Sequence, residues 1–256
     1  MKTLGNADSS ARWSIFLMLL CAVAFSASAL AAGDPWTTKS YLKWTNKDIA
    51  AILQSSPWAQ TEIQAIEAGH SGDASPITDQ FSVTSAGDET WGTLTVPPDY
   101  ITGPALNTEP RNYEILWLSA RTIRAAFAQE AVLRGKMTQK DAAKLVAQPQ
   151  DYYTILVRGP QLNLLQKRGE NALKDLAYLQ IPREKSKIHP SRVTFWRNTS
   201  GGVAGAVFYF PRTDAGGTPT VSPNMKQVDF YLLIVHKLVL TSFDPQRMRD
   251  RFGADL

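Results

Sequence analysis

Residues 113–135 read YEILWLSARTIRAAFAQEAVLRG, and they join a strand pattern directly to a helix pattern. Residues 113–118 are apolar enough to form a strand that is buried on both faces. Ser119 can then cap a helix over residues 120–134, and Gly135 is placed to end it. A strand followed at once by a helix predicts a domain in which helices pack on a sheet.

Downstream of this unit the chain predicts further helices and two β-hairpins. The predicted helices cover residues 138–147, 162–179 with Gly169 as a candidate break, and a short segment from Asp244-Pro245. The predicted strands cover 152–158, 192–197, 203–210, 228–234 and 238–243. The last four form the hairpins, while the strands at 113–118 and 152–158, which helices separate, are compatible with parallel pairing.

Upstream, residues 34–43 are expected to be extended. Residues 46–54 predict a helix with Asn46 or Thr45 as cap and Asp48 in its first turn. A second short helix is expected over 59–68, followed by loops containing short strands at 80–84 and 91–96. The fold class is therefore α+β, with N-terminal helices followed by a mixed, largely antiparallel sheet with helices packed on it. Segments 32–111 and 112–256 are two domains or parts of one.

The first 31 residues have the order of a secretory signal peptide. Lys2 and Arg12 precede an apolar run over 15–25, and small residues follow it. Two A-x-A sites are present, and we expect cleavage after Ala31, with Ala29 as the second choice. The protein is thus expected in the periplasm or outside the cell. An uncleaved membrane anchor is the alternative, whereas a lipoprotein is disfavoured because Cys21 lies in the middle of the apolar run.

Net charge and cysteine content limit the functions that the mature chain could have. Loss of residues 1–31 removes Lys2, Arg12 and Asp8, so the net charge falls from +4 to +3. This surplus is too small to indicate a nucleic-acid partner. Cys21 is the single cysteine and leaves with the signal, so the mature chain would have no disulfide and no thiol nucleophile.

Motifs for metal, nucleotide or triad chemistry are weak. The histidines are His70, His189 and His236, and only Glu67–His70 has a ligand-like E-x-x-H spacing. Residues 69–73 place His, Ser and Asp together but lack the frame of a nucleophile elbow, so a flexible loop explains them better. We therefore expect no metal site, no catalytic residue and no cofactor.

The best local candidate for a binding site is the predicted helix start at Ser119, with Arg121 and Arg124 close behind. Free backbone N–H groups at a helix N-terminus attract anions, and two guanidinium groups can hold a carboxylate or phosphate. The simpler interpretation is a capped helix whose arginines pair with nearby acids or lie in solvent.

Basic residues at 183–192 and 247–251, and tryptophans spread along the chain, are weaker candidates. They could contact anionic lipid or glycan, but scattered tryptophans more often belong to the core and charged runs are more often solvated.

Several short motifs together resemble a group of exported proteins from soil acidobacteria. They are Trp44, Lys47-Asp48, the SPWA tetrapeptide at 56–59, LSAR at 118–121 and FPR at 210–212. The resemblance covers most of the mature chain. It implies an envelope or secreted location and supplies no activity, cofactor or site.

Three functional hypotheses follow from the sequence. The leading one is a non-catalytic binding or scaffolding module of the bacterial envelope, whose partner is an unidentified envelope protein or a glycan. On this hypothesis there is no nucleic-acid partner, and the membrane is reached only through an uncleaved signal segment. The alternatives are a carboxylate-dependent envelope hydrolase and a small-anion-binding protein that uses the helix start at Ser119.

Overall fold

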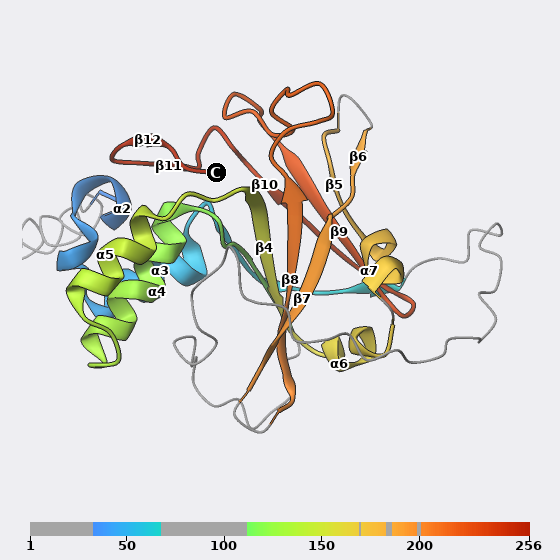
Figure 1. The fold of residues 1–256 in the computed structure, drawn as a ribbon, viewed down its shortest axis with the longest axis horizontal. Coiled ribbons are helices and arrows are strands. Elements are labelled where there is room, and N and C mark those ends of the chain that lie inside the picture. The colour runs from blue at the N-terminus through green and yellow to red at the C-terminus, as the bar shows by residue number, and fades with distance from the viewer. Residues whose placement is uncertain (1–32, 68–111, 169, 183–185, 199–200) are drawn as a thin grey trace, which may run out of the picture.

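The computed structural model describes residues 33–67, 112–168, 170–182, 186–198 and 201–256. Within them the chain forms two five-stranded sheets, and the helices between residues 35 and 147 gather at one end of the molecule (Figure 1). All strand pairs of the two sheets are antiparallel. The α+β class is therefore confirmed.

The strands are distributed between two sheets, A and B, in an order that differs from their order in the sequence. Sheet A has the order β1 (Ala59–Ile63), β3 (Tyr113–Trp117), β4 (Tyr152–Arg158), β8 (Val203–Pro211), β7 (Arg192–Arg197). Sheet B has the order β2 (Ile66–Glu67), β10 (Lys237–Phe243), β9 (Val228–Ile234), β5 (Ala177–Gln180), β6 (Lys187–Ile188). A small hairpin of β11 (Arg249–Asp250) and β12 (Gly253–Ala254) follows. Since β1 joins sheet A and β2 joins sheet B, the segment before residue 68 contributes to both sheets.

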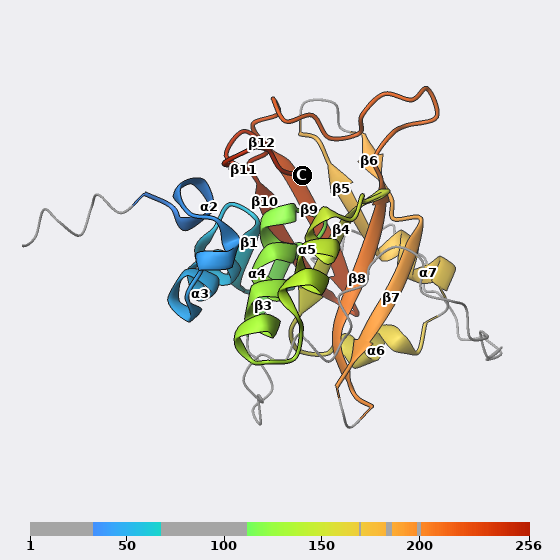
Figure 2. The ribbon, with the colours of Figure 1, turned by 60° about the vertical axis from the view of Figure 1, so that its left-hand side comes forward.

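Local sequence signals explain where the main helices begin. The helices are α2 (Pro35–Thr38), η2 (Tyr41–Lys43), α3 (Asn46–Ser55), α4 (Arg121–Leu133), α5 (Gln139–Ala147), α6 (Leu162–Gln166) and α7 (Glu170–Leu176). Thr45 and Asp48 form a reciprocal capping box at α3, and the Thr138 hydroxyl accepts from the backbone of Asp141 at α5. Gly135 takes a φ of 68° just past α4, as its predicted role requires. Figure 2 shows α3, α4 and α5 grouped together.

The expected parallel pairing of the first two long strands is wrong. β3 and β4 are antiparallel, with Leu116 opposite Leu156. The connection contains two helices, α4 and α5, and the second returns the chain toward the end where the first began. The following strand therefore runs opposite to β3.

Four other expectations about secondary structure are also wrong. Residues 59–67 form β1 and β2 instead of a helix, and the chain after Leu176 enters β5 instead of continuing as a helix. Residues 34–43 contain α2 and η2 instead of an extended lead-in. No terminal helix starts at Asp244, where a turn leads to β11 and β12. The strands expected at 80–84 and 91–96 lie outside the described residues.

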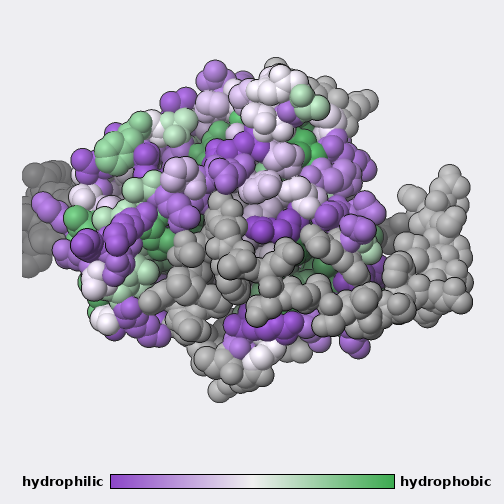
Figure 3. Space-filling model, in the orientation of Figure 1, coloured by the Kyte–Doolittle hydropathy of each residue, from purple (hydrophilic) through white to green (hydrophobic). Residues whose placement is uncertain are grey.

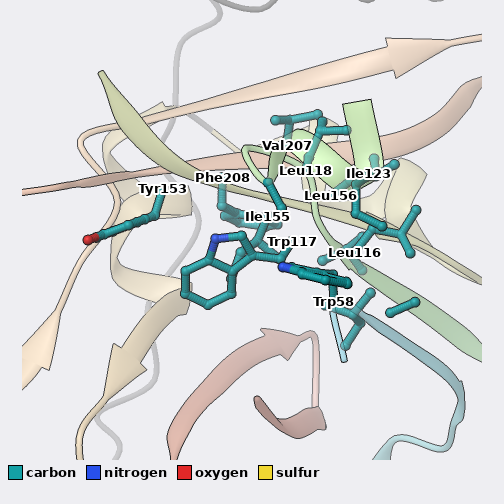
Figure 4. Packing of buried hydrophobic residues seen from close by; sticks show 14 of the residues in the cluster. Trp58, Leu116, Trp117, Leu118, Ile123, Tyr153, Ile155, Leu156, Val207 and Phe208 are labelled. Atoms are coloured by element: carbon teal, nitrogen blue, oxygen red, sulfur yellow. The ribbon is translucent and has the colours of Figure 1, made fainter. Parts of the chain in front are cut away.

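The core lies on both faces of sheet A. On one face, Phe208 and Phe210 contact Phe230 of sheet B with ring centroids 5.8 and 6.3 Å apart. On the other face, Ile123 of α4 lies beside Leu156 and Val207 (Figure 4). The central strands β4 and β8 are consequently buried on both faces, which accounts for their nearly continuous apolar sequence.

Sheet B is covered on one face only in the part of the chain that the structure describes. Along β10, Val239, Thr241 and Phe243 are buried, whereas Leu240 and Ser242 are exposed. This alternation is typical of a strand with one face in the core. Among the described residues, sheet B therefore has one face that no other element covers, and this face is a candidate functional surface.

Two further observations concern the surface and the helices. Hydrophilic residues dominate the coloured surface on the side shown in Figure 3. Among the described residues, none of the helices combines the length and the apolar character needed to cross a bilayer.

Candidate functional site

The helix start that the sequence marked as an anion site is organised differently from the expectation. The N-cap of α4 is Ala120, not Ser119, and no side chain within the helix's own first turn caps it. The Ser119 hydroxyl instead accepts a hydrogen bond from the backbone N–H of Thr154, at 3.2 Å. Ser119 therefore ties the strand end of β3 to β4 and leaves the helix N–H groups to another partner.

That partner is a carboxylate from the distant end of the described chain. The backbone N–H groups of Arg121 and Thr122 donate to the two carboxylate oxygens of Asp255, at 2.7 and 2.8 Å. These are the unpaired donors that would bind a free anion at a helix N-terminus. The position predicted for a ligand is thus occupied by the protein's own side chain.

Arg121 and Arg124 are also engaged within the protein. The Arg121 guanidinium donates two hydrogen bonds to Asp250, at 2.9 and 2.7 Å, and lies 4.6 Å from the centre of the Phe252 ring. Arg124 is buried, and its guanidinium donates to the backbone carbonyls of residues 145, 146 and 148. Burial lowers the pKa of Arg124 to about 10, although the charge of Asp255 opposes that shift. The structure gathers the three predicted residues around one turn, where Ser119 joins β3 to β4, Arg121 binds Asp250 and Arg124 joins α4 to the end of α5.

The role of Asp255 at the start of α4 was not predicted from the sequence. Burial raises the pKa of the Asp255 carboxyl, and the hydrogen bonds from Thr122 and Arg121 offset part of that rise. Its backbone is held as well, because the indole N–H of Trp58 donates to the Asp255 carbonyl at 2.6 Å. A local sequence pattern cannot indicate this cap, because Asp255 lies more than 130 residues from α4, the helix that it caps.

In the described part of the chain, the histidines do not gather with carboxylates. His189 and His236 are exposed on different elements, and His70 lies outside the described residues. Across the described ranges, no group of three or more His, Cys, Asp or Glu side chains could hold a metal ion. Asp250 and Asp255 are close enough to interact, yet both are committed to contacts at the start of α4.

The side of sheet B that no other described element covers is the surface with the clearest binding character among the described residues. We call it the open face, and it consists of the outward-pointing side chains of β2, β10, β9 and β5: Ile66, Leu238, Leu240, Ser242, Asp229, Tyr231, Leu233, Tyr178 and Gln180. Ile66 is 56% exposed and Leu240 is 39% exposed. Large apolar side chains gathered on one exposed sheet face are typical of an interaction surface.

Two tyrosines form the centre of the open face. The rings of Tyr178 and Tyr231 stack with centroids 4.5 Å apart and planes 15° apart. The Lys187 ammonium covers the other side of the Tyr178 ring, at 4.3 Å from its centre. Since ring faces are used within this row, the hydroxyl groups and ring edges are what the tyrosines can offer a partner.

The one carboxylate of the open face is already satisfied. Asp229 is only 8% exposed, and it accepts hydrogen bonds from the Gln227 amide at 2.8 Å and the Ser242 hydroxyl at 2.6 Å. The centre of the face is therefore apolar and aromatic, with the exposed Lys187 ammonium beside it over the Tyr178 ring.

The sequence of β9 carries part of the signal for this surface. The alternation of Val228, Phe230, Leu232 and Ile234 predicted the buried side of β9 correctly. The positions between them include Tyr231 and Leu233, and a solvated strand face normally carries polar residues there. From sequence alone, large apolar residues on both sides of a strand indicate burial on both faces, and only the structure shows that no other described element covers this side of β9.

Comparison with known proteins adds no relative. The chain matches no protein-family model, no curated protein and no solved structure.

Proposed function

We propose that the protein is an exported, non-catalytic binding module whose contact surface is the open face of sheet B. The observation that carries this proposal is the composition of that face: exposed Ile66 and Leu240, a stacked tyrosine pair, and one hydrogen-bonded carboxylate. Interfaces with proteins are enriched in tyrosine and depleted of charge at their centre.

The proposed location outside the cytoplasm is supported by the signal-like order of residues 1–31 and by the resemblance to exported proteins of soil acidobacteria. Intact mass spectrometry of the accumulated protein tests this part. A mass lacking about the first 31 residues is expected, and a full-length mass in the membrane fraction would contradict it.

The alternatives receive less support from the site geometry. A small-anion site at α4 would have to displace Asp255, whose carboxylate holds both N–H donors. A hydrolase with two carboxylates needs them facing each other across a cleft, whereas Asp250 and Asp255 are buried against Arg121 and the α4 backbone.

A photo-crosslinking amino acid at position 240 tests the binding proposal in the producing organism. Leu133 provides a matched control, since it is also an exposed leucine but lies at the end of α4 in the helical layer. We expect a discrete adduct from position 240 and none from position 133. Identical adduct patterns at the two positions, or no adduct at position 240, would rule out a specific contact at the open face.

A further inference from the structure

We infer that Tyr178 and Tyr231 are a site of oxidative crosslinking, where a one-electron oxidant joins β5 covalently to β9 through a dityrosine bond. The two residues are directly opposite each other in neighbouring antiparallel strands. The Cβ atoms of such a pair are about 4.5–5.5 Å apart, and the rings stack with centroids 4.5 Å apart. The inference is separate from the binding function, because it needs no partner on the open face.

Both rings can be reached by a small oxidant. Tyr178 and Tyr231 are each part-exposed, and no other described element covers their side of sheet B. A dityrosine bond joins two rings edge to edge, so the stacked rings must turn before they can couple. Rotation about the Cα–Cβ and Cβ–Cγ bonds provides that turn, and part-exposed side chains have room for it.

The reaction balances with hydrogen peroxide as the oxidant. Each phenol loses one electron and one proton, and the phenoxyl radicals that result carry unpaired spin on the carbons beside the hydroxyl group. A bond forms between one such carbon of each ring, and the hydrogen on each of these carbons moves to the ring oxygen, which restores two phenols. At a haem peroxidase, the two electrons and two protons reduce one hydrogen peroxide to two waters. Burial raises the pKa of both phenols, so at neutral pH each must release its proton as well as its electron.

The other contact between tyrosine rings in the described part of the chain lacks this geometry. The rings of Tyr152 and Tyr209 have centroids 6.0 Å apart and planes at 89°. Tyr209 is only 6% exposed, its hydroxyl lies 3.3 Å from the Thr194 hydroxyl, and the Arg192 guanidinium lies 4.1 Å from its ring centre. Tyr209 is therefore held in place, and its neighbour Tyr152 provides a matched control tyrosine.

A dityrosine bond at this position would fasten two strands of sheet B. The single cysteine of the chain, Cys21, cannot form a disulfide within it. The new bond closes the segment between residues 178 and 231 into a loop, which lowers the entropy of the unfolded chain as a disulfide does. The crosslinked protein is therefore expected to unfold at a higher urea concentration than the unmodified protein.

Treatment of the purified protein with a haem peroxidase and hydrogen peroxide tests the crosslink. We expect dityrosine fluorescence in the monomer fraction. We also expect a proteolytic peptide pair, joined through residues 178 and 231, that is lighter than its two parts by two hydrogen atoms. Tyr178→Phe and Tyr231→Phe keep the ring but cannot form the phenoxyl radical, so each variant should lose both signals. Tyr152→Phe should keep both.

Urea denaturation before and after the treatment tests the effect on stability. The treatment should raise the urea midpoint of the wild type and not that of Tyr178→Phe, in which methionines are oxidised equally. Equal changes in the two proteins would overturn the stabilising effect. The crosslink itself is overturned by a treated monomer without dityrosine, by linked peptides that contain other tyrosines, or by dityrosine that forms only between copies of the chain.

Discussion

Asp255 illustrates how much a single side chain can stabilise this fold. Replacement by alanine leaves the part-buried N–H group of Arg121 and the buried N–H group of Thr122 without an acceptor. Each unsatisfied buried donor costs about 1–3 kcal/mol, so Asp255→Ala should lower the free energy of unfolding by about 2–4 kcal/mol. Urea denaturation measures the change. Asp34→Ala is the control, because Asp34 is exposed and its side chain caps nothing, and an equal loss in both variants would contradict the role of Asp255.

The same carboxyl gives a pH dependence with a defined sign. Burial raises the pKa of Asp255 in the folded protein, so between the unfolded value of about 3.9 and the raised value the folded state binds more protons than the unfolded state. Stability from this group therefore falls as pH rises through that window. The unfolding free energy of wild type minus that of Asp255→Asn should decrease from about pH 4 upward. An increase over the same range would mean that the N–H bonds outweigh burial.

Val235 adopts a backbone conformation that is unfavourable for valine and lowers the stability of the folded state. It lies in the turn between β9 and β10 with a φ of 57°, a region that β-branched residues rarely adopt, and it is 38% exposed. Asparagine accepts this conformation more easily. Val235→Asn should raise the free energy of unfolding by about 0.5–1 kcal/mol, measured by thermal and urea denaturation. Destabilisation would show that the valine side chain contributes more packing than its exposure suggests.

At the scale of elements, α4 is surrounded more completely than its sequence indicates. The pattern of Ile123 and Phe127 predicted a narrow buried face, but every residue from Thr122 to Gln129 is buried. Its alanines allow α3, α5 and sheet A to approach from different sides. Ala126→Leu should therefore cost about 1–3 kcal/mol through overpacking, whereas Leu133→Ala, at an exposed position, should change stability little. Equal effects in calorimetry would contradict this packing.

The elements that could be predicted from sequence are those with signals inside the element. Thr45 with Asp48, Thr138 with Asp141, and Gly135 mark helix ends by contacts over a few residues. β1 and β5 carry no such signal. They are strands because β3 and β9 offer them unpaired backbone groups, and this tertiary pairing overrides local preference.

The candidate site follows the same rule. Arg121 and Arg124 were correctly expected near one helix start, but their partners are Asp250 and carbonyl groups of residues 145–148. Those contacts depend on how the C-terminal hairpin and α5 pack, which a pattern local to α4 cannot contain.

At the scale of the whole molecule, the aromatic contacts between the sheets should make unfolding cooperative. Phe230 of sheet B is fully buried against Phe208 and Phe210 of sheet A. Phe230→Ala should cost about 3–5 kcal/mol, and far-UV circular dichroism and tryptophan fluorescence should still report one transition, shifted together. Separate transitions would mean that the two sheets unfold independently.

The contact between Asp255 and α4 also bears on the order in which the molecule is made. A ribosome completes α4 long before it reaches Asp255, so the growing chain carries a helix whose first turn has no acceptor for its amides. The hairpin of β11 and β12, which brings Asp255 to its place, is synthesised last among the described elements. Completion of the α4 cap therefore waits until the last of the described elements has been made, a timing that would suit the export proposed for this chain.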